Sequence, residues 1–369
     1  MNIVTRNHLE KWANTIFSKS TLPYLISRLI RATTPPSTKV DMPWDSATYI
    51  GGWDGIVSCK EERAYVPLGI SLWELGTAAN CKEKADSDYE KRKNNPLGFA
   101  PQNATFVFVT PRLWTKKTEW IAAKKAEGYW KDVIAYDAVD LEQWLDSAPA
   151  VDRWLASEDG IEAYPFEGVM TADCFWKEWS TSPPITLTPE CVTAGRELEI
   201  NQLHSVLQDK PTIIGIRAPS SNEAIAFIVA AMKGLQDDAA GRFHAQTLII
   251  DSEANFRAIT SNSNHPLVII PRFYNAQPLD AAVSKGHHVL VPLGANDSFN
   301  QDTIALSSLK HHPLISALEA CNIPWEKATR LLKEAVYNIT RLKRLLGFPD
   351  LVPKWSKRED IREIIPALL

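Results

Sequence analysis

Two acidic residues lie inside otherwise apolar runs, where carboxylates are rare. Asp54 stands in "YIGGWDGIVSC" (49–59) and Glu74 in "LGISLWELG" (68–76). Burying a carboxylate is costly unless a partner or a metal ion compensates its charge. If the two runs pair as antiparallel strands, Asp54 comes roughly opposite Trp73, and Glu74 is close enough to share an ion with it. Two carboxylates with water suit Mg²⁺ (or Mn²⁺), which can activate water and stabilise charge on a phosphoryl group.

Simpler interpretations stay open for the same residues. Asp54, in its glycine-rich surroundings, also fits an ordinary turn, and Glu74 also fits a strand-end acid in solvent. Lys84 and Asp88 have the i,i+4 spacing of a surface ion pair on a helix. In these interpretations the acids carry no chemistry.

The composition is typical of a soluble globular protein. The chain has 369 residues, of which 45% are hydrophobic and 23% charged, and its net charge is −4. This length indicates two or three domains, and the net charge argues against wholesale electrostatic capture of nucleic acid or anionic lipid. Five scattered cysteines without CxxC spacing indicate reduced thiols. The sequence has neither an N-terminal signal-like segment nor a run of about 18 apolar residues, so we expect a cytoplasmic protein without membrane partners.

Alternating helix and strand patterns place the two acids in an α/β domain over 1–157. Residues 5–32 have helical spacing that Pro23 is expected to split into two helices. Asn80, with Glu83 three residues later, predicts the N-cap of a helix over 81–93. The other predicted elements are strands over 49–59, 68–76, 104–111 and 132–138, and helices over 116–128 and 140–156.

These features resemble the PD-(D/E)XK nuclease superfamily, and within it the Mrr-like restriction endonucleases. "GGWDGI" stands in the position of that family's Gly-x-Asp-Gly-Ile strand, and "SLWELG" in the position of its acid-x-Lys strand. The resemblance implies that Asp54 and Glu74 bind the metal, and that Glu10 on the first helix is a further acid. The lysine expected two residues after the acid is replaced by Gly76. In this superfamily it can migrate to a neighbouring helix, where "CKEKADSDY" offers Lys82 and Lys84, of which we favour Lys84.

A basic cluster follows the strand over 104–111. Arg112, Lys116 and Lys117, with Lys124 and Lys125, form the densest group of positive charges. They predict a surface that contacts DNA phosphates, although a solvated helix explains the cluster equally well.

The second half of the chain predicts another α/β domain over 191–300, joined by a linker over 158–190 and followed by a helical lid and tail over 301–369. "GRELEINQLHSVLQDKPTIIGIRAPSSNEAIAFIVAAM" resembles the start of a STAND-type P-loop NTPase. For the whole chain we therefore expect a restriction-endonuclease-like α/β domain followed by a P-loop-NTPase-like parallel α/β domain. The phosphate loop is replaced by "APSSNEA", which has neither glycines nor lysine for phosphate. We therefore expect no bound nucleotide, with Ser220, Ser221 or Asn222 capping a helix instead.

Together these patterns predict an Mg²⁺-dependent DNA endonuclease effector joined to a degenerate STAND-like module for regulation or oligomerisation, of the kind that bacteria use against phage. The expected partners are DNA and either further copies of the chain or another protein. The abrupt apolar end also leads us to expect a fragment or a shortened relative of longer STAND proteins. The alternative is a catalytically inactive nuclease fold that serves as a DNA- or protein-binding scaffold. An active ATPase switch is a third, weaker alternative.

Overall fold

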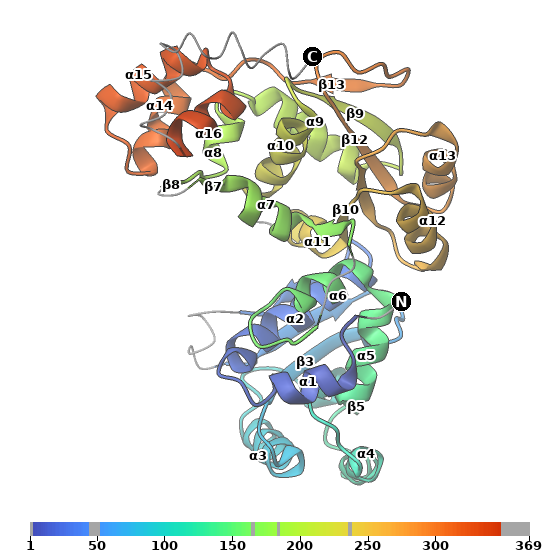
Figure 1. Cartoon of the computed structure of the whole chain (residues 1–369). Coiled ribbons are helices and arrows are strands. Elements are labelled where there is room, and N and C mark those ends of the chain that lie inside the picture. Colours follow the sequence, from blue (N-terminus) through green and yellow to red (C-terminus); the bar gives the residue numbers. More distant parts are fainter. Residues whose placement is uncertain (1–2, 44–51, 164–166, 183–184, 235–237, 348–369) are drawn as a thin grey trace. The chain divides into compact units, whose positions relative to one another are not determined.

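A five-stranded mixed sheet forms the centre of the N-terminal part of the chain (Figure 1). The computed structural model describes residues 3–43, 52–163, 167–182, 185–234 and 238–347. The strands follow the order β1-β2-β3-β4-β5, with antiparallel pairing from β1 to β3 and parallel pairing from β3 to β5. Their bounds are β1 Lys39–Asp41, β2 Gly55–Cys59, β3 Gly69–Leu75, β4 Ala104–Val109 and β5 Asp132–Tyr136.

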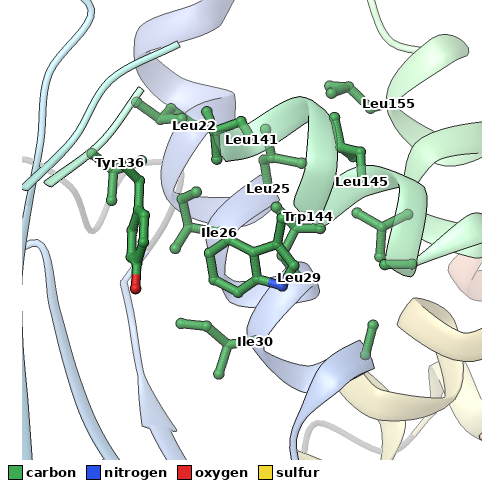
Figure 2. Close-up of a cluster of buried hydrophobic side chains, with 14 of the residues drawn as sticks. Leu22, Leu25, Ile26, Leu29, Ile30, Tyr136, Leu141, Trp144, Leu145 and Leu155 are labelled. Atoms are coloured by element: carbon green, nitrogen blue, oxygen red, sulfur yellow. The ribbon is translucent and has the colours of Figure 1, made fainter. Parts of the chain in front are cut away.

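One face of this sheet is covered by four helices. They are α1 (Arg6–Trp12), α2 (Phe17–Thr33), α5 (Ala138–Ser147) and α6 (Pro149–Ala156). Leucine and isoleucine side chains of α2 surround Trp144 of α5, as Figure 2 shows. The Trp144 indole N–H donates a 3.0 Å hydrogen bond to the Thr33 hydroxyl, so its one polar atom is satisfied inside the apolar core.

The opposite face of the sheet carries α3 (Cys81–Asn94) and α4 (Lys117–Ala126). Asn80 caps α3 as predicted, because its side-chain oxygen accepts a 3.2 Å hydrogen bond from the Glu83 backbone N–H. Along β3, Leu72 belongs to the core on this face whereas Trp73 belongs to the core on the other face. The period of two along a strand therefore directs Glu74 towards α3.

The first helices break at a different place from the predicted one. Pro23 lies inside α2, and the chain turns between Trp12 and Phe17 instead. The hydroxyls of Thr15 and Ser18 donate to the carbonyls of Trp12 and Thr15, so side chains in this turn satisfy the backbone where α1 ends. Strand β1 precedes the predicted first strand, of which residues 49–51 lie outside the described residues.

Two compact units divide the chain, and they interleave in sequence. The first comprises Met1–Thr171 with Gln236–His288, and the second comprises Ala172–Leu235 with Val289–Leu369. The predicted domains, in contrast, are contiguous stretches. In the first unit, β10 pairs in parallel with β11 and antiparallel with β6. The added elements are β6 Val169–Thr171, α11 Asp238–Gln246, β10 Thr247–Ile250, α12 Glu253–Asn262, β11 Val268–Pro271 and α13 Ala276–Ser284.

The second unit has β9 between β12 and β13, all three parallel. The segment 158–190, predicted as a linker, contributes α7 and two short strands to it, and β13 lies where only helices are expected. Its elements are α7 Ala172–Ser180, β7 Thr181–Ser182, β8 Ile185–Thr186, α8 Glu190–Thr193, α9 Glu197–Gln208, β9 Ile213–Arg217, α10 Ser221–Lys233, β12 His288–Leu293, β13 Thr303–Ala305, α14 His311–Ala320, α15 Trp325–Ala335 and α16 Ile339–Gly347.

The predicted α/β class is confirmed, since helices and mixed strands alternate through the described parts of the chain. None of the helices in those parts combines the length and the hydrophobicity that a membrane crossing requires.

Candidate active site

Asp54 and Glu74 come together at the edge where β2 begins and β3 ends. The pairing of β2 with β3 sets Gly55 opposite Trp73, so Asp54 comes level with Glu74 rather than with Trp73 as predicted. The one-residue difference arises because Asp54 Oδ2 accepts a 2.7 Å hydrogen bond from the backbone N–H of Leu75. This bond fixes the carboxylate against the strand that carries Glu74.

Glu74 is buried against an arginine. Its residue exposure is 2%, and its Oε1 pairs with Nε of Arg92 from α3. Arg92 also donates to the carbonyl of Gly52 and stands over the Trp53 ring, with its guanidinium carbon 4.7 Å from the ring centroid. An internal cation therefore compensates part of the charge that the sequence assigned to a metal. The alternative of a solvent-exposed strand-end acid is wrong for Glu74.

The electrostatics show that Arg92 does not fully compensate these acids. Burial raises the pKa of Glu74 to about 8, helped by the nearby charge of Asp54 and opposed by Arg92. Burial also raises the pKa of Asp54, against the hydrogen bond from Leu75 and the charges of Lys84 and Arg92. A further cation near the two carboxylates would lower both pKa values.

Lys84 lies over Gly76, the position where the resemblance described above leads us to expect a lysine. A Cβ atom built on Gly76 would stand 2.8 Å from Cγ of Lys84 and 3.1 Å from Cζ of Phe108. The absent side chain at residue 76 thus leaves the space that the Lys84 stem fills. Lys82, the other candidate, pairs instead with Asp86 on the exposed side of α3, with 2.6 Å between Nζ and Oδ2.

Asp88 also belongs to this site, although the sequence pattern assigns it no role in the chemistry. Its Oδ1 lies 2.7 Å from Nζ of Lys84, and its side chain is 5% exposed, so a surface ion pair is the wrong interpretation. Among the described residues its buried Oδ2 has no hydrogen-bond partner. Lys84, Asp88 and Arg92 follow one another at intervals of four residues along α3, which places them on one helix face. That spacing is the signal that could have revealed Asp88.

The donor set fits a magnesium ion held by two carboxylates and water. Within the described residues, Asp54 and Glu74 each use one oxygen in a protein hydrogen bond, which leaves Oδ1 of Asp54 and Oε2 of Glu74 for a ligand. Mg²⁺ commonly takes one or two protein carboxylates and keeps several waters. Within the part of the chain that the structure describes, three or more acids, histidines or cysteines do not gather in a way that could hold a metal.

Glu10 is not brought to the acid pair. Helix α1 packs on the sheet face opposite α3, through Leu9 and Trp12. Glu10 Oε1 accepts a 3.2 Å hydrogen bond from the backbone N–H of Leu113, in the loop after β4. Its contact is structural, and the predicted role of an auxiliary acid has no geometric support.

The predicted phosphate-contacting residues differ in their availability. Arg112 donates to the carbonyls of Thr77 at 2.7 Å and Ala13 at 3.0 Å, so it ties the loop after β3 to the end of α1. Lys117 is paired with Asp137, at 2.8 Å, and with Asp140. Lys116 is exposed. Of the three residues, only Lys116 is left facing solvent, whereas Arg112 and Lys117 are bound to other groups of the protein.

The start of α10 is occupied by the chain's own charges. Ser220 caps this helix as expected, accepting a 3.2 Å hydrogen bond from the Glu223 backbone N–H. The Glu223 side chain is buried in the first helical turn and lies 3.0 Å from Nη2 of Arg196. Arg196 also donates to the carbonyl of Ser307 at 2.9 Å. A carboxylate therefore stands at the helix N-terminus, where a phosphate would otherwise find favourable dipoles.

No protein-family model and no curated protein sequence matches this chain. Its function is therefore inferred from the geometry of its own residues.

Proposed function

We propose that the chain is a cytoplasmic, Mg²⁺-dependent DNA endonuclease effector whose reactive centre is Asp54, Glu74 and Lys84. The observation that carries the proposal is Lys84 packed over Gly76, at the sheet edge where Asp54, before β2, comes level with Glu74 at the end of β3. Two acids that can hold a metal ion, with a lysine close by, suit hydrolysis of a phosphodiester by an activated water.

Each residue has a distinct task in this proposal. Asp54 and Glu74 would hold the ion, which when bound would supply charge stabilisation at the phosphoryl group. Lys84, whose ammonium pairs with Asp88, would donate to the attacking water or to a phosphate oxygen. Asp88 would keep the Lys84 ammonium near Asp54 and Glu74, through the 2.7 Å contact between its Oδ1 and Nζ of Lys84. Arg92 holds Glu74 in its orientation.

Cleavage of plasmid DNA in the presence of Mg²⁺ tests this assignment. We expect Asp54→Asn and Glu74→Gln to abolish cleavage, and Lys84→Ala to lower it by about 100-fold or more, as for the loss of an acid–base group. Lys82→Ala is the matched control, because it removes a lysine of the same helix that pairs with Asp86. Wild-type cleavage that survives in the Asp54→Asn and Glu74→Gln variants rules out this site.

A non-catalytic scaffold is the second candidate, and the Arg92–Glu74 pair favours it, because an internal arginine already compensates one acid. Thermal unfolding with Mg²⁺ or Mn²⁺ distinguishes the two. An ion that binds only the folded chain must raise the unfolding midpoint, and the rise should vanish in Asp54→Asn. A wild-type midpoint that neither ion changes would support the scaffold.

We further propose that the second α/β region is a degenerate STAND-like module that regulates or oligomerises the nuclease without nucleotide, in defence against phage. The buried Arg196–Glu223 pair at the start of α10 supports nucleotide independence, because it fills the place of a phosphate with protein charges. Calorimetric titration with ATP should release no binding heat, and measurable binding would instead revive the ATPase alternative. Size-exclusion chromatography with light scattering tests for assembly.

A further inference from the structure

Two cysteines that are 130 residues apart in the sequence meet in the second unit. The Sγ atoms of Cys191 and Cys321 lie 3.7 Å apart, and both cysteines are free thiols. Cys191 belongs to the short helix α8, and Cys321 ends α14, which packs against α8. A disulfide requires an Sγ–Sγ distance of about 2.0 Å, so closing the bond needs only a small approach of the two side chains.

The two thiols have different surroundings. Cys191 is fully buried, whereas Cys321 is half-buried and the more accessible of the two. Burial and the neighbouring Cys321 raise the pKa of Cys191 to about 12. Cys191 therefore stays protonated near neutral pH, and an oxidant in solution meets Cys321 first.

We propose that Cys191 and Cys321 are a reversible redox pair that closes to a disulfide when the protein meets a hydroperoxide. This modification is independent of the acid pair and of its proposed chemistry. It assigns a function to two thiols that sequence spacing alone leaves as ordinary reduced cysteines.

The reaction balances in two steps. The Cys321 thiol gives up its proton and its sulfur attacks one oxygen of hydrogen peroxide. The O–O bond breaks, Cys321 becomes a sulfenic acid, and the other oxygen leaves as hydroxide, which takes up that proton to form water. The Cys191 sulfur then attacks the Cys321 sulfur, the S–O bond breaks, and the departing hydroxide takes the Cys191 proton as a second water. Two sulfurs have together lost two electrons, and the peroxide has gained them.

The bond would fix the end of α14 to α8. It would also close a covalent loop over residues 191–321, which restricts the unfolded chain and so favours the folded state. Oxidation should therefore raise the thermal unfolding midpoint of the full chain, and a dithiol reductant should return it to the original value.

Peptide mass spectrometry on the full chain tests the pair. After hydrogen peroxide treatment and alkylation of remaining thiols, we expect a peptide linked through Cys191 and Cys321, lighter by two hydrogen atoms than the sum of its halves and split by dithiothreitol. Cys174→Ser is the matched control, because it removes another half-buried cysteine of the same unit and should leave the link unchanged. Cys321→Ser should abolish it.

The experiment also has outcomes that contradict the proposal. A sulfinic acid on Cys321 without any link to Cys191 would show that the pair does not close. So would a disulfide between other cysteines while Cys191 and Cys321 stay alkylated. Circular dichroism of Cys321→Ser shows whether the variant is folded. If it is not folded, the presence or absence of the linked peptide in the wild-type protein still decides the proposal.

Discussion

At the scale of single residues, Glu74 is a buried acid whose charge the neighbouring arginine does not fully compensate. Glu74 pairs with Arg92, yet its pKa is raised to about 8 because burial and Asp54 both oppose its ionisation. Arg92 itself could not be anticipated from the sequence, since it is 18 residues from Glu74 and stands in a charged run that reads as a solvated helix face.

The raised pKa of Glu74 predicts how the free energy of unfolding depends on pH. The ordinary pKa of the group is 4.5, so between about pH 4.5 and 8 the folded state binds more protons at Glu74 than the unfolded state. Stability from this residue is therefore greatest below pH 4.5 and falls as the pH rises towards 8. Glu74→Gln cannot titrate, so the wild-type free energy of unfolding should decline relative to this variant, by roughly 2–4 kcal/mol across that window.

Urea unfolding of both proteins in EDTA, at several pH values, measures the difference. Any constant effect of the substitution cancels, because only its change with pH matters. A difference that stays level or grows with pH would contradict the assignment of this pKa to Glu74.

At the scale of elements, helix α3 supplies three of the site's five charged side chains. Its cap at Asn80 follows from the sequence, as do the strands on either side, because capping and periodicity are local properties. The register of β2 against β3 is not local: it depends on the bond from Leu75 to Asp54, and the prediction misses it by one residue. The break between α1 and α2 likewise follows side-chain hydrogen bonds of Thr15 and Ser18 rather than Pro23.

Removing the cap should therefore affect both the helix and the site. Asn80→Ala loses the hydrogen bonds to the backbone and side chain of Glu83, at 3.2 and 2.9 Å. We expect a loss of about 1 kcal/mol in the free energy of unfolding. Cleavage should fall too, because the start of α3 positions Lys84.

Chemical denaturation and the plasmid assay check this pair of effects. Ser87→Ala, an exposed substitution on the same helix, should leave both unchanged within error. Equal stability of Asn80→Ala and Ser87→Ala would contradict the structural role of the cap.

At the scale of the whole molecule, helix α11 (residues 238–246) packs against the N-terminal helices, although it lies far from them in the sequence. Arg242 of α11 donates to the carbonyls of Arg31, Thr34 and Thr38, at 2.8–3.0 Å, around the end of α2. Asp238 pairs with Arg31 at 2.8 Å. The sequence gives no signal for this return, because the partners are more than 200 residues apart and α11 itself was not predicted.

Arg242 is buried, and we expect the first unit to be sensitive to its substitution. Arg242→Ala leaves three carbonyls without their donor, and we expect a loss of about 2–4 kcal/mol in the free energy of unfolding. Arg257→Ala removes an exposed i,i+4 partner of Glu253 and should change the free energy of unfolding far less, because water screens exposed ion pairs.

Denaturant unfolding compares the two variants, and hydrogen exchange locates the effect. Faster exchange should appear at the end of α2 and in α11 for Arg242→Ala. Similar losses in the two variants would show that α11 contributes little to holding α2.

The interleaving of the two units bears on how the chain folds during synthesis. A ribosome delivers residues 1–171 first, yet the first unit is complete only when 236–288 have also emerged. Until then, the carbonyl groups at the end of α2 lack the hydrogen bonds that Arg242 donates, and this end of the helix is not covered by α11. Stalling translation before residue 236 should accordingly leave the N-terminal part open to chaperones and proteases, although its five-stranded sheet is already fully translated.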